Sequence, residues 1–404
     1  MTENPRPACK VPETKTTSRR PAVTLLLASA LLCFPAGAQL VVETRALRPD
    51  GRPLPGAVME ALPVPSNLEM QGALLDGRLP PATFRTVADS EGFLRLHLPE
   101  DGIWRVQVRA AGFISLWIPT LPAAEDLVLP PARLGRARDT RITFVVDEKP
   151  APPGTAVFAE GGDRGFWKDY EVGPWRLAPR IGWVGAEGTV LLPRGPGEAL
   201  DLWVLQPTVC QPQRAEAHCD GRITLDPSPK ARATWVFRDE EGRPIAGAIL
   251  TTRRRPLPLG RSGPDGRLEL RCRPETELEA LAFAPGQRLE ALSGRAGSGR
   301  ELTFRAPVLI RGKVTVASGQ EAAGVLVWPS GEPADARRTD TQGEFELHLP
   351  RGWPHRTEAL RKGMRGALQT FSGPSIPDLA SLVLAPAVEL VGTVQDAAGQ
   401  PLAG

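Results

Sequence analysis

The stretch RPDGRPLPGA at residues 48–57 decides the fold, because the chain uses the same phrase again. DEEGRPIAGA follows at residues 239–248 and DAAGQPLAG at residues 396–404, and all three contain the frame Gly-x-Pro-x-x-Gly. Two degenerate copies of the phrase keep its final glycine, at Gly154 and Gly324. The final glycines, at positions 56, 154, 247, 324 and 404, predict a tandem array with units of roughly 75 to 100 residues.

A second phrase follows each copy except the last and has the pattern of a strand. It reads DSEGFLRLHLP from Asp89, GAEGTVLLPRG from Gly185, GPDGRLELRCR from Gly263 and DTQGEFELHLPRG from Asp340. A third phrase closes each unit, as in LVLPP from Leu127. Apolar and polar residues alternate in the second phrase, which places one face of a strand in a core and the other in water. Because no segment shows a sustained helical period, the sequence predicts a β-sandwich for each unit.

The predicted organisation assigns the whole chain. It places a signal peptide with a long leader at 1–38 and a first repeat with an insertion at 39–136. A divergent second repeat covers 137–229, a third 230–306 and a fourth 307–386. Residues 387–404 are expected to begin a truncated fifth repeat, as in a fragment of a longer gene product.

Composition supports an all-β class. The chain contains 41 glycines and 43 prolines among 404 residues, yet 41% of its residues are hydrophobic, which is too many for disorder. Many turns combined with many apolar residues favour short strands. The net charge of +3 is close to balance and its arginines are scattered, so no nucleic-acid partner is expected.

The N-terminus carries the pattern of an export signal. A basic pair at residues 19–20 precedes an apolar run at 23–34 and a small-residue triplet that ends at Ala38. This pattern predicts cleavage between Ala38 and Gln39 and a secreted, periplasmic or cell-surface protein. The run is too short to span a bilayer comfortably, and no later stretch could do so.

The repeated phrases resemble a known family. RPDGRPLPGAVMEA, VADSEGFLRLHLPEDGIWRVQVRAAGF and TDTQGEFELHLPRG are similar to the pattern of the carboxypeptidase regulatory-like domains, over nearly all of residues 39–404. The resemblance implies a transthyretin-like or Ig-like sandwich of the carbohydrate-binding-like fold group. It also implies a bacterial module of secreted proteins that is usually non-catalytic, with relatives that bind glycans.

Candidate catalytic chemistry is sparse in the sequence. Of the four histidines, His97 and His348 occupy the same repeat position on the polar face of a strand, which favours a structural slot. The acidic residues near Asp89 and Asp239 lie where turns require Asp and lack the ligand spacing of a calcium loop. We therefore expect no catalytic residues, no metal and no cofactor, and we do not expect an enzyme.

Three cysteines follow the predicted cleavage point. Export to an oxidising compartment would allow a Cys210–Cys219 disulfide that closes a small loop. Cys272 is left over, and its position in the repeat matches inward leucines, so it is expected to be a buried, inert thiol.

An aromatic cluster lies in the insertion of the second repeat. Residues 161–183 contain Phe166, Trp167, Tyr170, Trp175 and Trp183. Such rings on a loop could stack on sugar rings or contact a partner protein. The alternative is that the inserted segment needs its own small core. Exposed rings would favour binding, and buried rings would end that hypothesis.

Three functions follow from these patterns. The leading prediction is a secreted repeat protein with a structural, display or protein-interaction role. The second is an extracellular polysaccharide-binding protein that uses the aromatic cluster. The third is the N-terminal part of a larger secreted enzyme or outer-membrane receptor, whose active part would follow Gly404.

Overall fold

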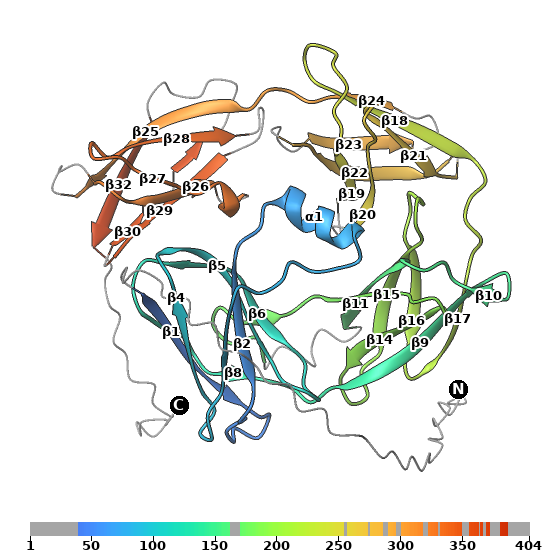
Figure 1. Cartoon of the computed structure of the whole chain (residues 1–404), viewed down its shortest axis with the longest axis horizontal. Coiled ribbons are helices and arrows are strands. Elements are labelled where there is room, and N and C mark those ends of the chain that lie inside the picture. The colour runs from blue at the N-terminus through green and yellow to red at the C-terminus, as the bar shows by residue number, and fades with distance from the viewer. Residues whose placement is uncertain are drawn as a thin grey trace, which may run out of the picture.

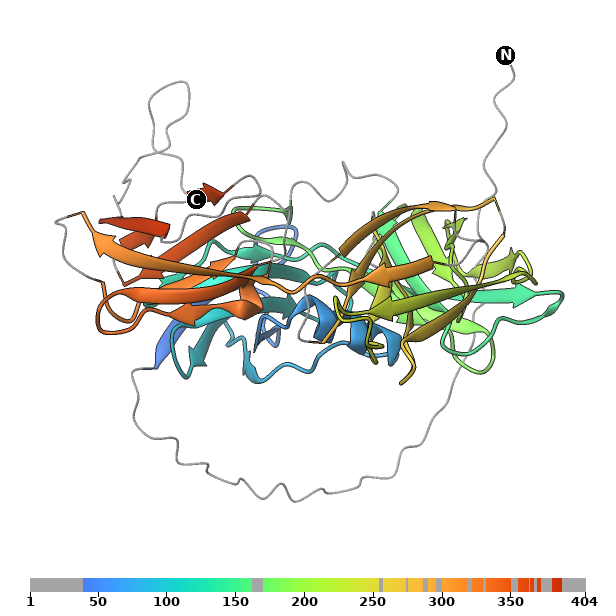
Figure 2. The same cartoon turned by 90° about the horizontal axis from the view of Figure 1, so that it is seen from above.

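The computed structural model describes most of the chain after the predicted cleavage point. The described residues are 39–161, 170–253, 257–273, 275–285, 290–295, 300–317, 322–329, 332–349, 355–362, 364–366, 369–371 and 380–386. The predicted signal peptide and the predicted fifth repeat lie outside them. Within them the fold is all-β, as predicted, and forms a tandem array of sandwiches. Figure 1 shows four sandwiches arranged around one short helix, and Figure 2 shows that they lie in a single flat layer.

The first sandwich packs a short-stranded sheet against a larger one. The first sheet contains β1 (Leu40–Leu47), β4 (Phe93–Leu98), β7 (Leu127–Val128) and β8 (Ala132–Arg133). The second has the order β12-β6-β5-β2-β3, from β12 (Arg176–Leu177), β6 (Leu116–Ala123), β5 (Gly102–Arg109), β2 (Val58–Pro63) and β3 (Phe84–Val87). Strand β12 therefore belongs to a sheet of the first sandwich, although its residues lie in the predicted second repeat.

The second and third sandwiches repeat this plan. The second pairs β9 (Arg138–Val146), β10 (Lys149–Pro150), β14 (Thr189–Arg194) and β17 (Gly221–Leu225) in one sheet. Its other sheet is β13 (Arg180–Trp183), β11 (Ala156–Gly161), β15 (Leu200–Leu205) and β16 (Gln213–Ala217). The third contains β18 (Arg232–Arg238), β21 (Arg267–Arg271) and β24 (Arg300–Thr303), opposite β19 (Ile249–Thr252), β20 (Pro258–Arg261), β22 (Glu277–Phe283) and β23 (Glu290–Arg295).

The fourth sandwich has its strands linked into one continuous sheet. One part contains β25 (Val308–Val316), β28 (Glu344–Leu349) and β32 (Ala380–Pro386). The other contains β26 (Leu326–Pro329), β27 (Arg337–Arg338), β29 (His355–Arg361), β30 (Met364–Gly366) and β31 (Gln369–Phe371), with the 3-10 turn η3 (Pro333–Asp335) after β26. The two parts join where β30 pairs with β32.

The repeated glycines have one geometric cause. The carbonyls of Gly92, Gly188, Gly266 and Gly343 accept a hydrogen bond, at 2.7–2.8 Å, from the strand that opens the same unit. All four have φ between 72° and 78°. A Cβ atom at any of them would lie 2.5–2.7 Å from a backbone carbonyl oxygen of that opening strand. Only glycine permits both the positive φ and the close approach, which explains why the second phrase recurs.

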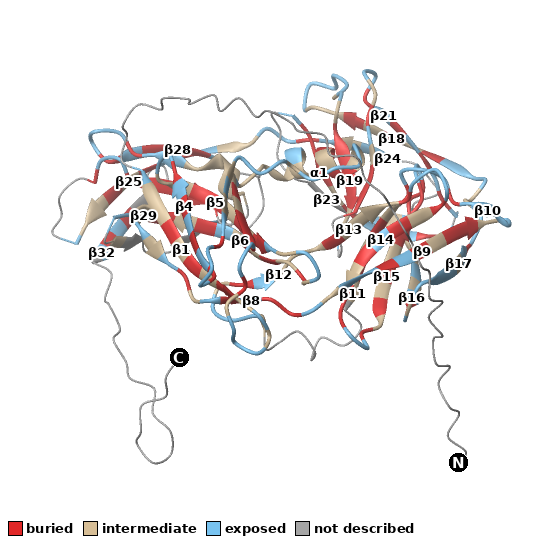
Figure 3. Cartoon of the chain, turned by 60° about the horizontal axis from the view of Figure 1, so that its bottom comes forward, coloured by how far each residue is buried: buried red, intermediate tan, exposed pale blue. Residues whose placement is uncertain are grey.

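The predicted alternation of the strands is confirmed. In β4, Leu94, Leu96 and Leu98 are buried and His97 is exposed. His97 lies opposite Val41, and His348 lies opposite Leu309 on the equivalent strand pair. Figure 3 shows that buried residues lie mainly on the strands of the sandwiches and exposed residues mainly on the turns.

One helix departs from the sequence analysis. Helix α1 (Asn67–Leu75) lies in the first unit between β2 and β3. Its start is fixed by a capping box, in which the Ser66 hydroxyl accepts from the backbone N–H of Glu69 and the Glu69 carboxylate accepts from that of Ser66. Among the described residues, none of the helices has the length and apolar character that crossing a membrane requires.

Candidate functional site

Trp175 of the aromatic cluster lies in the core of the first sandwich. Its side chain is 0% exposed, and its indole N–H donates to the carbonyl of Pro130 at 2.8 Å. The adjacent β12 pairs antiparallel with β6, with Arg176 opposite Trp117. The second repeat therefore completes the core and extends a sheet of the first, and the ring of Trp175 has no exposed face for a sugar.

The other aromatic residues do not form one platform with Trp175. Tyr170 packs, partly buried, against the first core, whereas the Trp183 indole N–H donates to the carbonyl of Leu74 in α1 at 3.1 Å. Phe166 and Trp167 lie outside the described residues, so their role in binding stays a prediction. The described members of the cluster contact protein, which agrees with the alternative that the insertion needs a core, although that core belongs to the neighbouring sandwich.

Helix α1 is the point where the sandwiches meet. Towards the fourth sandwich, both the backbone N–H and the side-chain amide of Asn67 donate to the carboxylate of Glu332, the former at 2.8 Å. Towards the third, the Thr251 hydroxyl donates to the amide oxygen of Gln71, a side chain that is 3% exposed. Together with the Trp183 contact from the second sandwich, these bonds connect α1 to all its neighbours in Figure 1.

Arg261 adds a polar contact at the other end of the helix. From β20 its guanidinium reaches the carbonyl of Gly72 at 3.4 Å and the carboxylate of Asp76 at 3.5 Å. A groove of about 670 Å³ runs beside these contacts, lined by residues of α1 and its flanks and by Ile249 of the third sandwich.

The first and fourth sandwiches also share an apolar contact. Ile103 of β5 packs with Leu326 and Trp328 of β26, and all three are less than 9% exposed. Beside this cluster, the guanidinium of Arg338 forms an ion pair with the Asp101 carboxylate, one of its bonds measuring 2.6 Å. The described part of the array therefore closes on itself, because its fourth sandwich packs on its first.

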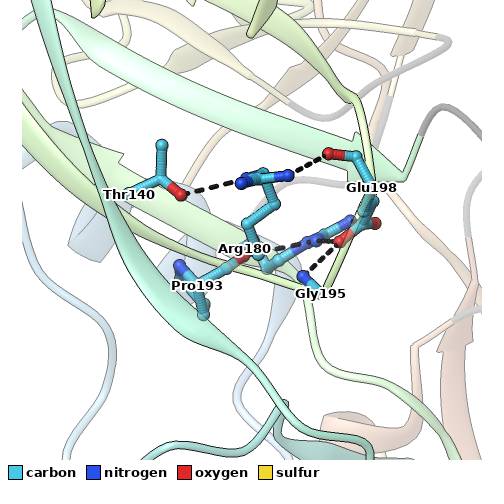
Figure 4. A network of polar contacts seen from close by, with 6 residues as sticks. Thr140, Arg180, Pro193, Gly195 and Glu198 are labelled. Atoms are coloured by element: carbon cyan, nitrogen blue, oxygen red, sulfur yellow. Dashed lines mark hydrogen bonds and ion pairs between the residues drawn. The ribbon is translucent and has the colours of Figure 1, made fainter. Parts of the chain in front are cut away.

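A buried charged network lies inside the second sandwich (Figure 4). Arg180 and Glu198 form a two-bond ion pair, with N···O distances of 2.9 and 3.0 Å. The Arg194 guanidinium donates to the Thr140 hydroxyl at 3.1 Å and to the Glu198 carbonyl at 2.6 Å. The backbone N–H of Gly195 donates to the Glu198 carboxylate at 2.8 Å. These bonds hold the β14–β15 connection against the neighbouring strands.

The strand register argues against the predicted Cys210–Cys219 disulfide, and both of these described cysteines carry reduced thiols in the structure. In the β15–β16 hairpin, Val204 pairs with Gln213 and Leu200 with Ala217. Cys210 precedes Gln213 at one end of the hairpin, and Cys219 follows Ala217 at the other. Four residues of strand span roughly 13 Å, beyond the roughly 7 Å limit between the Cα atoms of a disulfide.

Acidic residues at the repeated turns serve the backbone. The Asp89 carboxylate accepts from the backbone N–H groups of Glu91 and Phe93, each at 2.9 Å, and Asp239 and Asp340 do the same in later units. Among the residues that the structure describes, no group of three or more His, Cys, Asp or Glu side chains could hold a metal ion.

Helix α1 was not predicted from the sequence, and neither was the packing of Trp175 in the core of the first sandwich. The capping box S-x-x-E at residues 66–69 was a readable signal for the start of α1. The helix itself is short, with few apolar residues at helical spacing. Nothing in the sequence indicates that Trp175 enters a different sandwich, because that depends on how two units pack.

Comparisons with known proteins give fold-level likeness at most. No protein-family model matches the chain, and no curated protein sequence matches it. A Streptococcal ancillary pilin is 8% identical over 62% of this chain and 100% of that chain, with a TM-score of 0.23. The Bacillus anthracis TIE protein is 10% identical over 88% of this chain and 76% of that chain, with a TM-score of 0.18. A variant of the shaft pilin spaA from Lactobacillus rhamnosus GG is 14% identical over 47% of this chain and 96% of that chain, with a TM-score of 0.19. At these scores the likeness carries no argument, and the fold rests on the strand pairing itself.

Proposed function

We propose that the chain is an exported structural protein whose sandwiches form one rigid, closed scaffold that is displayed outside the cytoplasm. The observation that carries this proposal is the set of contacts around α1. A helix inserted into the first sandwich bonds to the other three that the structure describes, and the fourth packs on the first through Trp328 and Arg338. Flexible strings of modules lack such contacts between non-adjacent units.

The buried polar groups of the second sandwich support a structural rather than a catalytic role. Arg180, Arg194 and Glu198 direct their polar atoms to one another and to nearby backbone. Each bond fixes a strand or a turn of the second sandwich. A scaffold of this kind would contact other proteins through its exposed turns, which is the interaction role that the sequence predicts.

Small-angle X-ray scattering in solution tests the closed scaffold. A single compact body of this length has a radius of gyration of about 21 Å, and the flat ring in Figure 2 should lie only slightly above that value. A flexible string of separate sandwiches would scatter with a much larger radius and a featureless profile. An extended profile at physiological salt would contradict the proposal.

Export is tested separately. Residues 1–38 are fused to a reporter enzyme that becomes active only outside the cytoplasm, and we expect activity. The matched control is Leu26→Arg, which places a charge in the apolar run and should abolish export. Equal reporter activity from both fusions would show that this segment is not an export signal.

A further inference from the structure

Cys210 and Cys272 lie side by side between two sandwiches. Cys210 belongs to the connection between β15 and β16 of the second sandwich, and Cys272 follows β21 of the third. Residues 209 and 271 are partners in an isolated parallel bridge, and the two cysteines are the residues that directly follow them. The backbone N–H of Cys210 donates to the carbonyl of Arg271 at 3.1 Å, and that of Arg271 to the carbonyl of Thr208 at 2.7 Å.

Both side chains enter the same core. Cys210 is 1% exposed and Cys272 is 0% exposed, and both belong to the apolar core of the third sandwich. Leu205 of the second sandwich is part of that core as well. The backbones of bridged partners run about 4.8 Å apart, which lies within the separation that a disulfide spans.

The two thiols are already in contact. The hydrogen bond between them raises the pKa of Cys210 and lowers the pKa of Cys272. Because Cys210 is 1% exposed and Cys272 is 0% exposed, an oxidant does not reach them in the folded protein, so oxidation belongs to the folding reaction, when both thiols are still reachable. Once formed, the bond would be shielded from reductants by the surrounding core.

We propose that Cys210 and Cys272 form a structural disulfide that joins the second sandwich to the third. A thiolate of one cysteine attacks a small disulfide such as glutathione disulfide, forms a mixed disulfide and releases one glutathione. The second thiolate attacks the protein sulfur of the mixed disulfide and releases the other glutathione. The two protein thiols lose two electrons and two protons, and both are recovered in the two glutathione thiols.

Tryptic mapping under non-reducing conditions tests this pairing. The full chain, with Cys9 and Cys33 of the predicted signal peptide replaced by serine, is unfolded, reduced and refolded in a glutathione redox buffer, and free thiols are then alkylated. Trypsin places the three cysteines in separate peptides, at residues 195–214, 215–222 and 272–288. We expect 195–214 to be linked to 272–288. Recovery of 195–214 linked to 215–222, linked to glutathione, or alkylated would overturn the proposal.

Matched variants give a second readout. Cys219→Ser should keep the linked peptides, and Cys272→Ala should lose them. Because the bond closes a long loop, protein refolded in the presence of a reductant should melt about 5 °C or more below protein refolded in the glutathione buffer, both for the unaltered sequence and for Cys219→Ser. A reduction-sensitive melting temperature that disappears in Cys219→Ser would refute the assignment even if Cys272→Ala does not fold. The outcome is independent of export, because the oxidant is supplied in the buffer.

Discussion

Single residues set the turn geometry, and glycines in one unit allow a matched test. Gly242 and Gly266 both have positive φ, of 77° and 72°. A Cβ at Gly242 would meet no atom within 4 Å, whereas one at Gly266 would lie 2.5 Å from the carbonyl oxygen of Phe237. We expect Gly242→Ala to cost about 1–2 kcal/mol and Gly266→Ala about 1–3 kcal/mol more. Native-state hydrogen exchange in β18 and β21 measures both, and equal costs would contradict the role of the close approach.

The buried ion pair of the second sandwich predicts an asymmetric response to mutation. Arg180→Met leaves the buried carboxylate of Glu198 without its main cation and should destabilise this sandwich by about 3–5 kcal/mol. Arg214→Met breaks the pair with Asp201 on an arginine whose side chain is 65% exposed, and should cost less than about 1 kcal/mol. Chemical denaturation of the two variants compares them. Similar losses would mean that burial does not govern this pair.

Glu60 gives the first sandwich a pH dependence. A hydrogen bond from Arg109 lowers the pKa of Glu60, against an opposing effect of burial. A folded-state pKa below the unfolded one contributes stability that is complete above the unfolded value of about 4.5 and is lost as pH falls through the folded value. The free energy of unfolding of Glu60→Gln should therefore fall less than that of the unaltered protein as the pH is lowered from roughly 5 to roughly 2. Denaturation at several pH values measures this difference. If the free energies of unfolding of the unaltered protein and of Glu60→Gln change equally with pH, Glu60 does not contribute to the pH dependence.

At the scale of elements, the sequence predicts what depends on neighbours along the chain. Alternation in β4 and the glycine of each second phrase follow from local pleat and turn geometry, and both are confirmed. The insertion of Trp175 into another sandwich and the proximity of Cys210 and Cys272 depend on how separate units pack. No local pattern encodes that packing, so the sequence left a binding loop and a separate small core as alternatives for the aromatic cluster, and it favoured a different cysteine pair.

The shared core predicts a long-range effect of one tryptophan. Trp175→Ala removes a side chain that is 0% exposed and should destabilise the first sandwich by about 3–5 kcal/mol, although it belongs to the second repeat. Trp183→Phe is the control, because it removes the indole donor to Leu74 and should cost only about 1 kcal/mol. Hydrogen exchange in β5 and β6 reports the difference. Unchanged protection there in Trp175→Ala would contradict the shared core.

At the scale of the molecule, one ion pair helps to close the ring. Arg338→Glu places a negative charge against Asp101 and should weaken the contact between the first and fourth sandwiches, which raises the radius of gyration. Arg337→Glu changes the same charge one residue away, on a side chain that bonds within the described structure only to the Ala336 carbonyl. Small-angle scattering compares the two at low salt. An equal response from both variants would show that net charge, and not this contact, is responsible.

Because β12 and Trp175 come from the second repeat but complete the first sandwich, they also affect the order in which the sandwiches fold during synthesis. Until Trp175 and β12 have been synthesised, the first sandwich has an empty place in its core and an unpaired edge on β6. The N-terminal part of the protein therefore reaches its final stability only after its neighbour has begun to fold. For the export that we propose, such a delay would keep the newly made chain unfolded for longer, in the state that export machinery can transport.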